Sequence, residues 1–93
     1  MDMTIYEYTD ENKNLLYRQI RYYKNGNKSF YSEKYVDGKW IKGIDGVERV
    51  LFNLPQIKEA ISKDEKIYFV EGEKDVLTLK EKGKVATTIA GRC

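Results

Sequence analysis

The chain has 93 residues, of which 41% are hydrophobic and 34% charged, and its formal net charge is +2. This composition is typical of one small globular domain rather than a disordered chain, and no apolar run approaches the ~20 residues of a membrane span. The first residues have neither a basic segment nor an apolar core, so we expect no signal peptide. With no histidine and one cysteine, at position 93, the sequence nearly excludes a zinc site and favours the cytoplasm.

Charge is distributed unevenly along the chain. Residues 1–12 carry four acidic residues and no base, whereas residues 13–42 carry eight bases against two acids, an excess of six positive charges. Residues 43–93 carry nine of each. A basic segment next to an acidic leader favours an anionic partner or a charged protein interface.

The first half of the chain predicts an antiparallel β-meander. Alternating side chains indicate strands in four segments, at residues 4–8, 15–23, 29–36 and 39–41. Tight turns are expected at Asn25-Gly26 and Asp37-Gly38. Asn-Gly is a strong hairpin signal because both central residues of a type I′ turn need positive φ. We expect residues 47–52 to form a strand or an extended link.

The longest predicted strand has two distinct faces. Leu16, Ile20 and Tyr22 share one face, which we assign to the core. The side chains of the opposite face, Tyr17, Arg21 and Tyr23, are then expected to point outward, together with Lys24 and Lys28 at the turn. Reversing three of these charges to glutamate, at Arg21, Lys24 and Lys28, is expected to remove binding and leave the fold intact.

The second half of the chain changes to helical periodicity. Pro55 suits the first turn of a helix, and a second helix is expected over residues 73–82, with Gly83 as its left-handed cap. The inward faces predicted for the two helices are Leu54, Ile57, Ala60 and Ile61 in the first and Val76, Leu77 and Leu79 in the second. Residues 66–70 and 84–89 predict two parallel strands, the first of them buried, joined by a right-handed crossover.

The predicted fold class is therefore α+β. An antiparallel β-meander is followed by a helix–strand–helix–strand unit. A β-rich basic and aromatic region, residues 1–52, is expected to pack with residues 53–93 as one small domain.

The sharpest motif lies at residues 69–79, which read FVEGEKDVLTL. It places Glu71 at the C-terminal tip of a strand, followed by a glycine and a helix, and strand tips are where α/β folds place ligand sites. The motif resembles the first motif of the TOPRIM family of primases and topoisomerases: an apolar strand, Glu-Gly, two variable residues, Asp and an apolar helix. RVLFNLP at residues 49–55, and VATT at residues 85–88 followed by Gly91, are similar to the neighbouring segments of phage and plasmid primases of the primase-helicase type.

The resemblance implies an active-site glutamate at Glu71 and a motif aspartate at Asp75. In that family a later Asp-x-Asp pair binds Mg²⁺, and this sequence contains no Asp-x-Asp. Because Mg²⁺ is held by several carboxylates or phosphates, we expect the two residues to be inactive, with no metal, no cofactor and no catalysis. The missing part of the sheet predicts an open strand edge near residues 84–89, which would recruit a second copy or a partner strand.

The basic and aromatic stretch is the candidate binding surface. Rings on a sheet can stack on bases while lysine and arginine side chains track phosphates, although a protein interface or a solvated face would use the same residues. The candidate residues for a nucleic acid or another partner are Tyr17, Arg21, Tyr23, Lys24, Lys28, Lys34, Lys39 and Trp40.

Three functional hypotheses follow from these patterns. The first is a non-catalytic, phage-type regulator or inhibitor, derived from a primase fragment, that binds a nucleic acid or nucleoprotein. An anti-CRISPR protein is its most concrete form. The second is a replication component, a primase fragment whose TOPRIM site is completed by a partner chain. The third is a remnant without a selected role.

Overall fold

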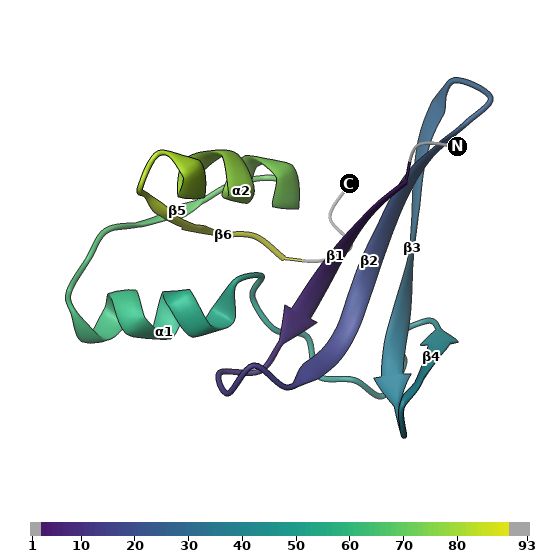
Figure 1. Cartoon of the computed structure of the whole chain (residues 1–93), viewed down its shortest axis with the longest axis horizontal. Coiled ribbons are helices and arrows are strands. Elements are labelled where there is room, and N and C mark those ends of the chain that lie inside the picture. Colours follow the sequence, from purple (N-terminus) through teal and green to yellow (C-terminus); the bar gives the residue numbers. More distant parts are fainter. Residues whose placement is uncertain (1–2, 90–93) are drawn as a thin grey trace.

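The protein has the α+β architecture that the sequence predicts, in a computed structural model that describes residues 3–89 (Figure 1). The first four strands form one antiparallel sheet in the order β1-β2-β3-β4, and the last two form a parallel pair. In chain order the elements are β1 (Met3–Thr9), β2 (Leu15–Lys24), β3 (Asn27–Val36), β4 (Lys39–Lys42), α1 (Leu54–Ser62), β5 (Ile67–Phe69), α2 (Glu73–Glu81) and β6 (Val85–Thr87).

The meander has the two tight turns predicted from the sequence. Asn25 and Gly26 have φ angles of 52° and 78°, and Asp37 and Gly38 have 51° and 78°. Asparagine, aspartate and glycine are the residues that adopt this left-handed conformation most readily. The first turn closes the long β2–β3 hairpin, whose tip projects beyond the rest of the molecule (Figure 1).

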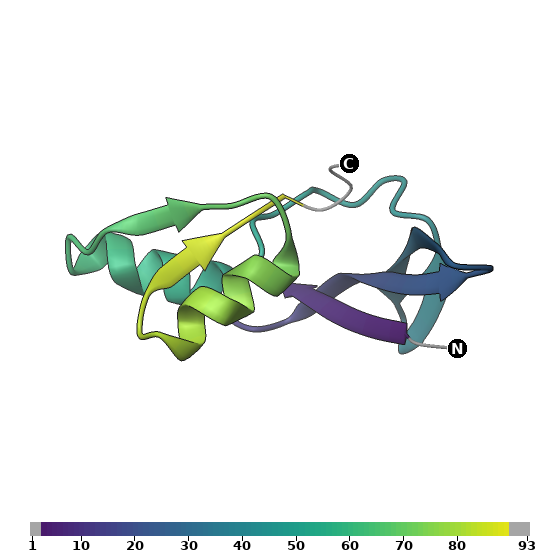
Figure 2. The same cartoon turned by 90° about the horizontal axis from the view of Figure 1, so that it is seen from above.

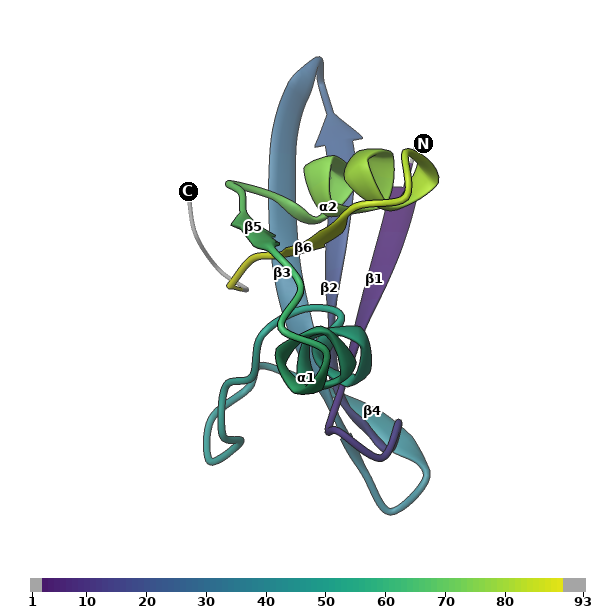
Figure 3. The ribbon, with the colours of Figure 1, turned by 90° about the vertical axis from the view of Figure 1, so that its left-hand side faces the viewer.

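The second half of the chain forms three thin layers, in which α2 and α1 lie on opposite sides of the β5–β6 pair (Figure 3). Pro55 lies in the first turn of α1, as expected, and Gly83, with φ of 77°, follows the end of α2. Residues 47–52 form an extended link apart from one bridge at Leu51. No helix among the described residues is long and apolar enough to cross a membrane.

Three apolar side chains of this half are exposed, contrary to prediction. Ile61 and Leu77 are 62% and 40% exposed, although Ile57, Ala60 and Val76 on the same helices are buried. Strands of three residues are too short to cover the last turn of α1 or a wide stripe of α2. Phe69, in the strand predicted to be buried, is 56% exposed, because β5 pairs with a neighbour on one side only.

An aromatic core joins the two halves. The buried cluster consists of Tyr6, Tyr8, Tyr17, Phe52, Val76 and Ala86. The ring of Tyr8 stacks on Tyr17 with centroids 4.8 Å apart and lies 5.1 Å from Phe52. The Tyr17 hydroxyl donates to the Val50 carbonyl and accepts from the Val50 amide. Rings from the meander therefore fix the link that leads into α1.

The outward orientation predicted for Tyr17 is wrong. Tyr17 is fully buried, although Ile20, assigned to the core on the opposite face, is also buried, at 1% exposed. β2 is an inner strand. Its side chains Tyr17 and Arg21 contact the second half of the chain, at Val50 and Glu73. Ile20 lies on the other face, between its cross-strand neighbours Ile5 and Tyr31. Figure 2 shows the helices and β5–β6 meeting the meander at one end.

The open edge predicted at residues 84–89 is partly covered, at residues 88 and 89. Residues of the link lie along the outer side of β6, where the Phe52 amide donates to the Thr88 carbonyl at 2.9 Å and Leu51 bridges Ile89. On the other side of β6, the Val70 amide donates to the Thr87 carbonyl. Within residues 3–89 both strands of this small sheet are edge strands, and the link covers only part of the β6 edge, so any recruitment of a further strand is expected at β5 or at the uncovered part of β6.

Candidate functional site

A hollow of about 440 Å³ lies between the β2–β3 hairpin and the start of α2. This volume falls within the roughly 300–1,000 Å³ of small-molecule sites. Side chains from β1, β2, β3 and α2 line it: Thr4, Tyr6, Arg21, Tyr22, Tyr23, Lys28, Ser29, Phe30 and Lys74. The lining brings Lys74 of α2 together with residues of the meander that are far from it in the sequence.

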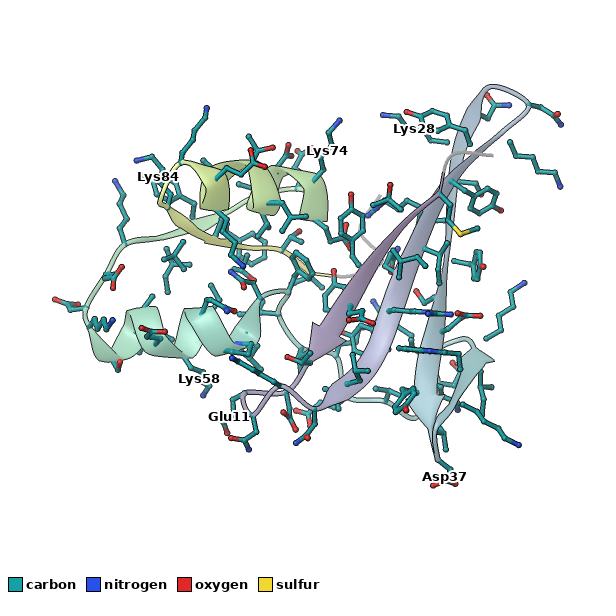
Figure 4. The ribbon with its side chains drawn as sticks, viewed as in Figure 1. Glu11, Lys28, Asp37, Lys58, Lys74 and Lys84 are labelled. Atoms are coloured by element: carbon teal, nitrogen blue, oxygen red, sulfur yellow. The ribbon has the colours of Figure 1, made fainter. Side chains whose placement is uncertain are left out.

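The hollow is basic. Arg21, Lys28 and Lys74 line it, and no acidic side chain of the described residues does. Lys28 lies near the tip of the hairpin, and Lys74 lies in the first turn of α2 on the other side of the space between them (Figure 4). Both lysines are exposed. An anion that entered here would meet positive charge from three different elements.

Aromatic rings form much of the remaining lining. Tyr23 is 49% exposed and Phe30 is partly buried, whereas the ring of Tyr22 packs against Tyr31 on the other face of the sheet. The Arg21 guanidinium lies 5.1 Å from the Phe30 ring centroid, a distance at which the ring attracts the cation. The site therefore offers planar apolar surfaces beside its positive charges.

A buried carboxylate lies behind the hollow. Glu73 is 1% exposed. Its Oε2 accepts a hydrogen bond of 2.7 Å from the Tyr8 hydroxyl. Its Oε1 accepts one of 3.1 Å from Arg21 Nε and forms an ion pair with Nη2 of the same side chain at 3.0 Å. A buried charge is tolerated only when it is paired and hydrogen-bonded. Glu73 thus holds Arg21 at the wall of the hollow and joins α2 to the meander.

The tyrosines around this carboxylate stay protonated. Burial raises the pKa of Tyr8, and the hydrogen bond to Glu73 raises it further. Burial also raises the pKa of Tyr6, with the nearby Glu73 carboxylate acting in the same direction and Arg21 opposing it. Tyr8 is therefore a hydrogen-bond donor to Glu73 at neutral pH, and Arg21 is the group that balances the charge of the carboxylate.

Three of the binding residues predicted from the sequence meet at this hollow. Arg21, Tyr23 and Lys28 line it, and Lys24 is exposed at the adjoining turn. Arg21 is not a free surface side chain, however, because it is paired with Glu73. Tyr17, in the same predicted set, is part of the core.

The other predicted residues lie elsewhere. Lys34 donates to the Asp45 carbonyl at 3.0 Å, and Lys39 is exposed at the start of β4, beyond the opposite end of the hairpin. Trp40 lies on the other face of the sheet, with the Arg18 guanidinium 4.0 Å from its ring centroid. The predicted stretch is therefore not one continuous surface.

The positions matching the family motif do not line the hollow. Glu71 and Asp75 are both exposed, and the described residues contain no group of three acidic, histidine or cysteine side chains that could hold a metal ion. The two positions that the motif leaves variable are Glu73 and Lys74, and these are the residues at the hollow. Sequence reasoning missed Glu73, although it precedes Val76 by three residues and so shares the buried helix face.

No family model, no curated protein and no solved structure matches this chain significantly. The TOPRIM resemblance therefore stays a prediction from residues 49–55, 69–79 and 85–88.

Proposed function

We propose that this chain is a non-catalytic binding protein that recognises a nucleic acid, alone or within a nucleoprotein, at the hollow. The observation that carries the proposal is the convergence of Arg21, Lys28 and Lys74 on a space that the half-exposed ring of Tyr23 also lines. Cations supply the affinity for phosphates, and rings supply stacking surfaces for bases. Single-stranded nucleic acid suits such a site because its bases are free to leave a stack.

The biological form we propose is regulation or inhibition of a nucleoprotein in the cytoplasm of a bacterial host. An anti-CRISPR protein of a phage is the most concrete example. The resemblance of residues 69–79 to phage primases supports this form, as does the basic excess of residues 13–42.

The binding itself is tested with a fluorescently labelled single-stranded oligonucleotide, whose anisotropy reports complex formation. The variant Lys28→Glu/Lys74→Glu should bind at least tenfold more weakly than the unaltered chain, because each reversal replaces attraction of a phosphate by repulsion. The control Lys39→Glu/Lys80→Glu changes the net charge equally at exposed positions away from the hollow. An equal loss in both variants would mean that net charge, and not the hollow, determines binding.

A second candidate is a replication component whose TOPRIM site is completed by a partner chain. It is favoured by the order α1-β5-α2-β6 and by the turn at Glu71-Gly72 between β5 and α2. Primer synthesis on mixing with a chain that supplies an Asp-x-Asp half, abolished by Glu71→Gln, would establish this function. Under the first proposal no primers form.

A further inference from the structure

We infer that the hollow recognises a terminal phosphate, a phosphomonoester attached to a nucleoside, in preference to a phosphodiester within a strand. The inference rests on the proposed function for the nucleoside part of the ligand. The inference further specifies that the site prefers the doubly charged, terminal form of phosphate.

The charge of the lining matches a dianion. Arg21, Lys28 and Lys74 contribute three positive charges, and the ion pair with Glu73 neutralises one of them, which leaves two. A phosphomonoester carries about −1.5 to −2 at pH 7, whereas each phosphate within a strand carries a single negative charge. A terminal phosphate therefore balances the site, and an internal phosphate leaves it positive.

The arrangement of the cations suits one phosphate better than a row of phosphates. Grooves that follow a nucleic-acid backbone distribute positive charge along their length. Here the cations come from β2, β3 and α2 and surround a single hollow. Lys28 and Lys74 approach it from opposite sides (Figure 4). We therefore assign a single phosphate to the space between the two lysines.

Arg21 is positioned before any ligand arrives. Its Nε and Nη2 atoms are bound to Glu73, and Glu73 is fixed in turn by the Tyr8 hydroxyl. Nη1, the remaining nitrogen of the guanidinium, is the one that we assign to a phosphate oxygen. Because the side chain is already ordered, binding costs less conformational entropy than it would for a free arginine.

The rings beside the cations give the site its preference for a nucleoside. Tyr23, about half exposed, lies directly across the hairpin from Lys28 in the lining, so a base can stack on its ring while the phosphate lies between the lysines. A free nucleotide and the end of a strand share this chemistry. Comparing a nucleoside monophosphate with a phosphorylated oligonucleotide separates the two sources.

The test compares one short single-stranded oligonucleotide in three forms: with a 5′-phosphate, with a 3′-phosphate and with no terminal phosphate. Binding of a nucleoside monophosphate and of inorganic phosphate is measured by calorimetry under the same conditions. We expect one of the phosphorylated ends to bind about tenfold more tightly than the unphosphorylated oligonucleotide, since it adds charge-assisted hydrogen bonds. Lys74→Gln should remove this difference, and Lys80→Gln on the same helix should retain it.

Each outcome has one reading. Equal affinity for all three oligonucleotides, lost in Lys28→Glu/Lys74→Glu, would overturn the terminal-phosphate inference while the proposed function stands. A nucleoside monophosphate that binds as tightly as the phosphorylated oligonucleotide would support the inference and identify the free nucleotide as the source. Binding of inorganic phosphate with equal affinity would exclude the nucleoside part, and no binding of any probe would overturn both proposals.

Discussion

Glu73 is an acidic residue on the buried face of α2. It is 1% exposed, and Val76, three residues later on the same face, is fully buried. Its two oxygens are bound by Tyr8 from β1 and Arg21 from β2. The same three side chains therefore connect the two halves of the molecule and fix one wall of the hollow. Under the proposed function, this carboxylate couples stability to binding.

Reversing Arg21 should therefore destabilise the fold, contrary to the expectation from sequence that this change leaves it intact. Removing one partner of a buried pair costs about 3–5 kcal/mol. Because the Arg21 side chain is 35% exposed and water can reach it, we expect about 1–3 kcal/mol for Arg21→Glu. Lys24→Glu, at an exposed position on the same strand, should change stability by no more than about 0.5 kcal/mol.

Urea unfolding of the two variants measures both values. Equal stability of Arg21→Glu and Lys24→Glu would show that the buried pair does not contribute to the fold.

Because of Tyr8, the free energy of unfolding is expected to fall with rising pH in alkaline solution. Its pKa is raised above the ordinary value of 10.0, first by burial and then by the hydrogen bond to Glu73. Because the folded-state pKa is the higher one, the stabilisation is fully present below pH ~10 and is lost as the pH rises above that value. Between pH ~10 and the raised pKa of the folded state, the ionisation of Tyr8 in the unfolded chain lowers the free energy of unfolding by about 1.4 kcal/mol for each pH unit.

The variant Tyr8→Phe should show a shallower loss of stability between about pH 10 and 11.5, by that slope, because it has no hydroxyl to ionise. At pH 7 it should be less stable by about 1–3 kcal/mol, since Glu73 loses one hydrogen bond. Urea unfolding at a series of pH values tests both effects. An unchanged slope would mean that Tyr8 ionises in the folded protein as it does in the unfolded chain.

At the scale of the elements, two glycines with different roles position the hollow. Gly26 has φ of +78° in the hairpin turn, whereas Gly72, before α2, has φ of −147°, and an added Cβ at either position would meet nothing within 4 Å. Gly26→Ala should therefore cost about 1 kcal/mol from the left-handed backbone alone. Gly72→Ala should cost about 0.5 kcal/mol, because the extended backbone suits alanine but alanine is a poorer N-cap for α2 than glycine.

Thermal unfolding of the two alanine variants compares the glycines directly. A larger loss in Gly72→Ala than in Gly26→Ala would contradict the backbone geometry described above.

The elements themselves were largely predictable from local sequence. Both Asx-Gly turns, the helix that begins near Pro55 and the parallel strands around α2 follow from turn chemistry and periodicity. What alternation could not determine is which face of β2 is covered by the second half, because rings lie on both faces. Tyr17 was misplaced for that reason, and Gln19 is buried on the same face.

At the scale of the whole molecule, the hollow depends on contacts that no local pattern encodes. Lys74 and Lys28 lie in different halves of the chain, and they come together only because the aromatic core packs α2 against the meander. The sequence therefore predicted half of the candidate site, the part on the hairpin. The part on α2 required the packing of the two halves.

Under the proposed function Lys28 and Lys74 bind phosphate at the hollow, and the salt dependence of binding measures their contribution. Each phosphate contact on a single strand contributes about 0.7 to the slope of log affinity against log salt concentration. If the two lysines bind separate phosphates, Lys28→Gln/Lys74→Gln should lower the slope by about 1.4, and if they share a terminal phosphate, by at least about 0.7. The matched variant Lys39→Gln/Lys80→Gln should keep the slope of the unaltered chain. An unchanged slope in Lys28→Gln/Lys74→Gln would contradict the account.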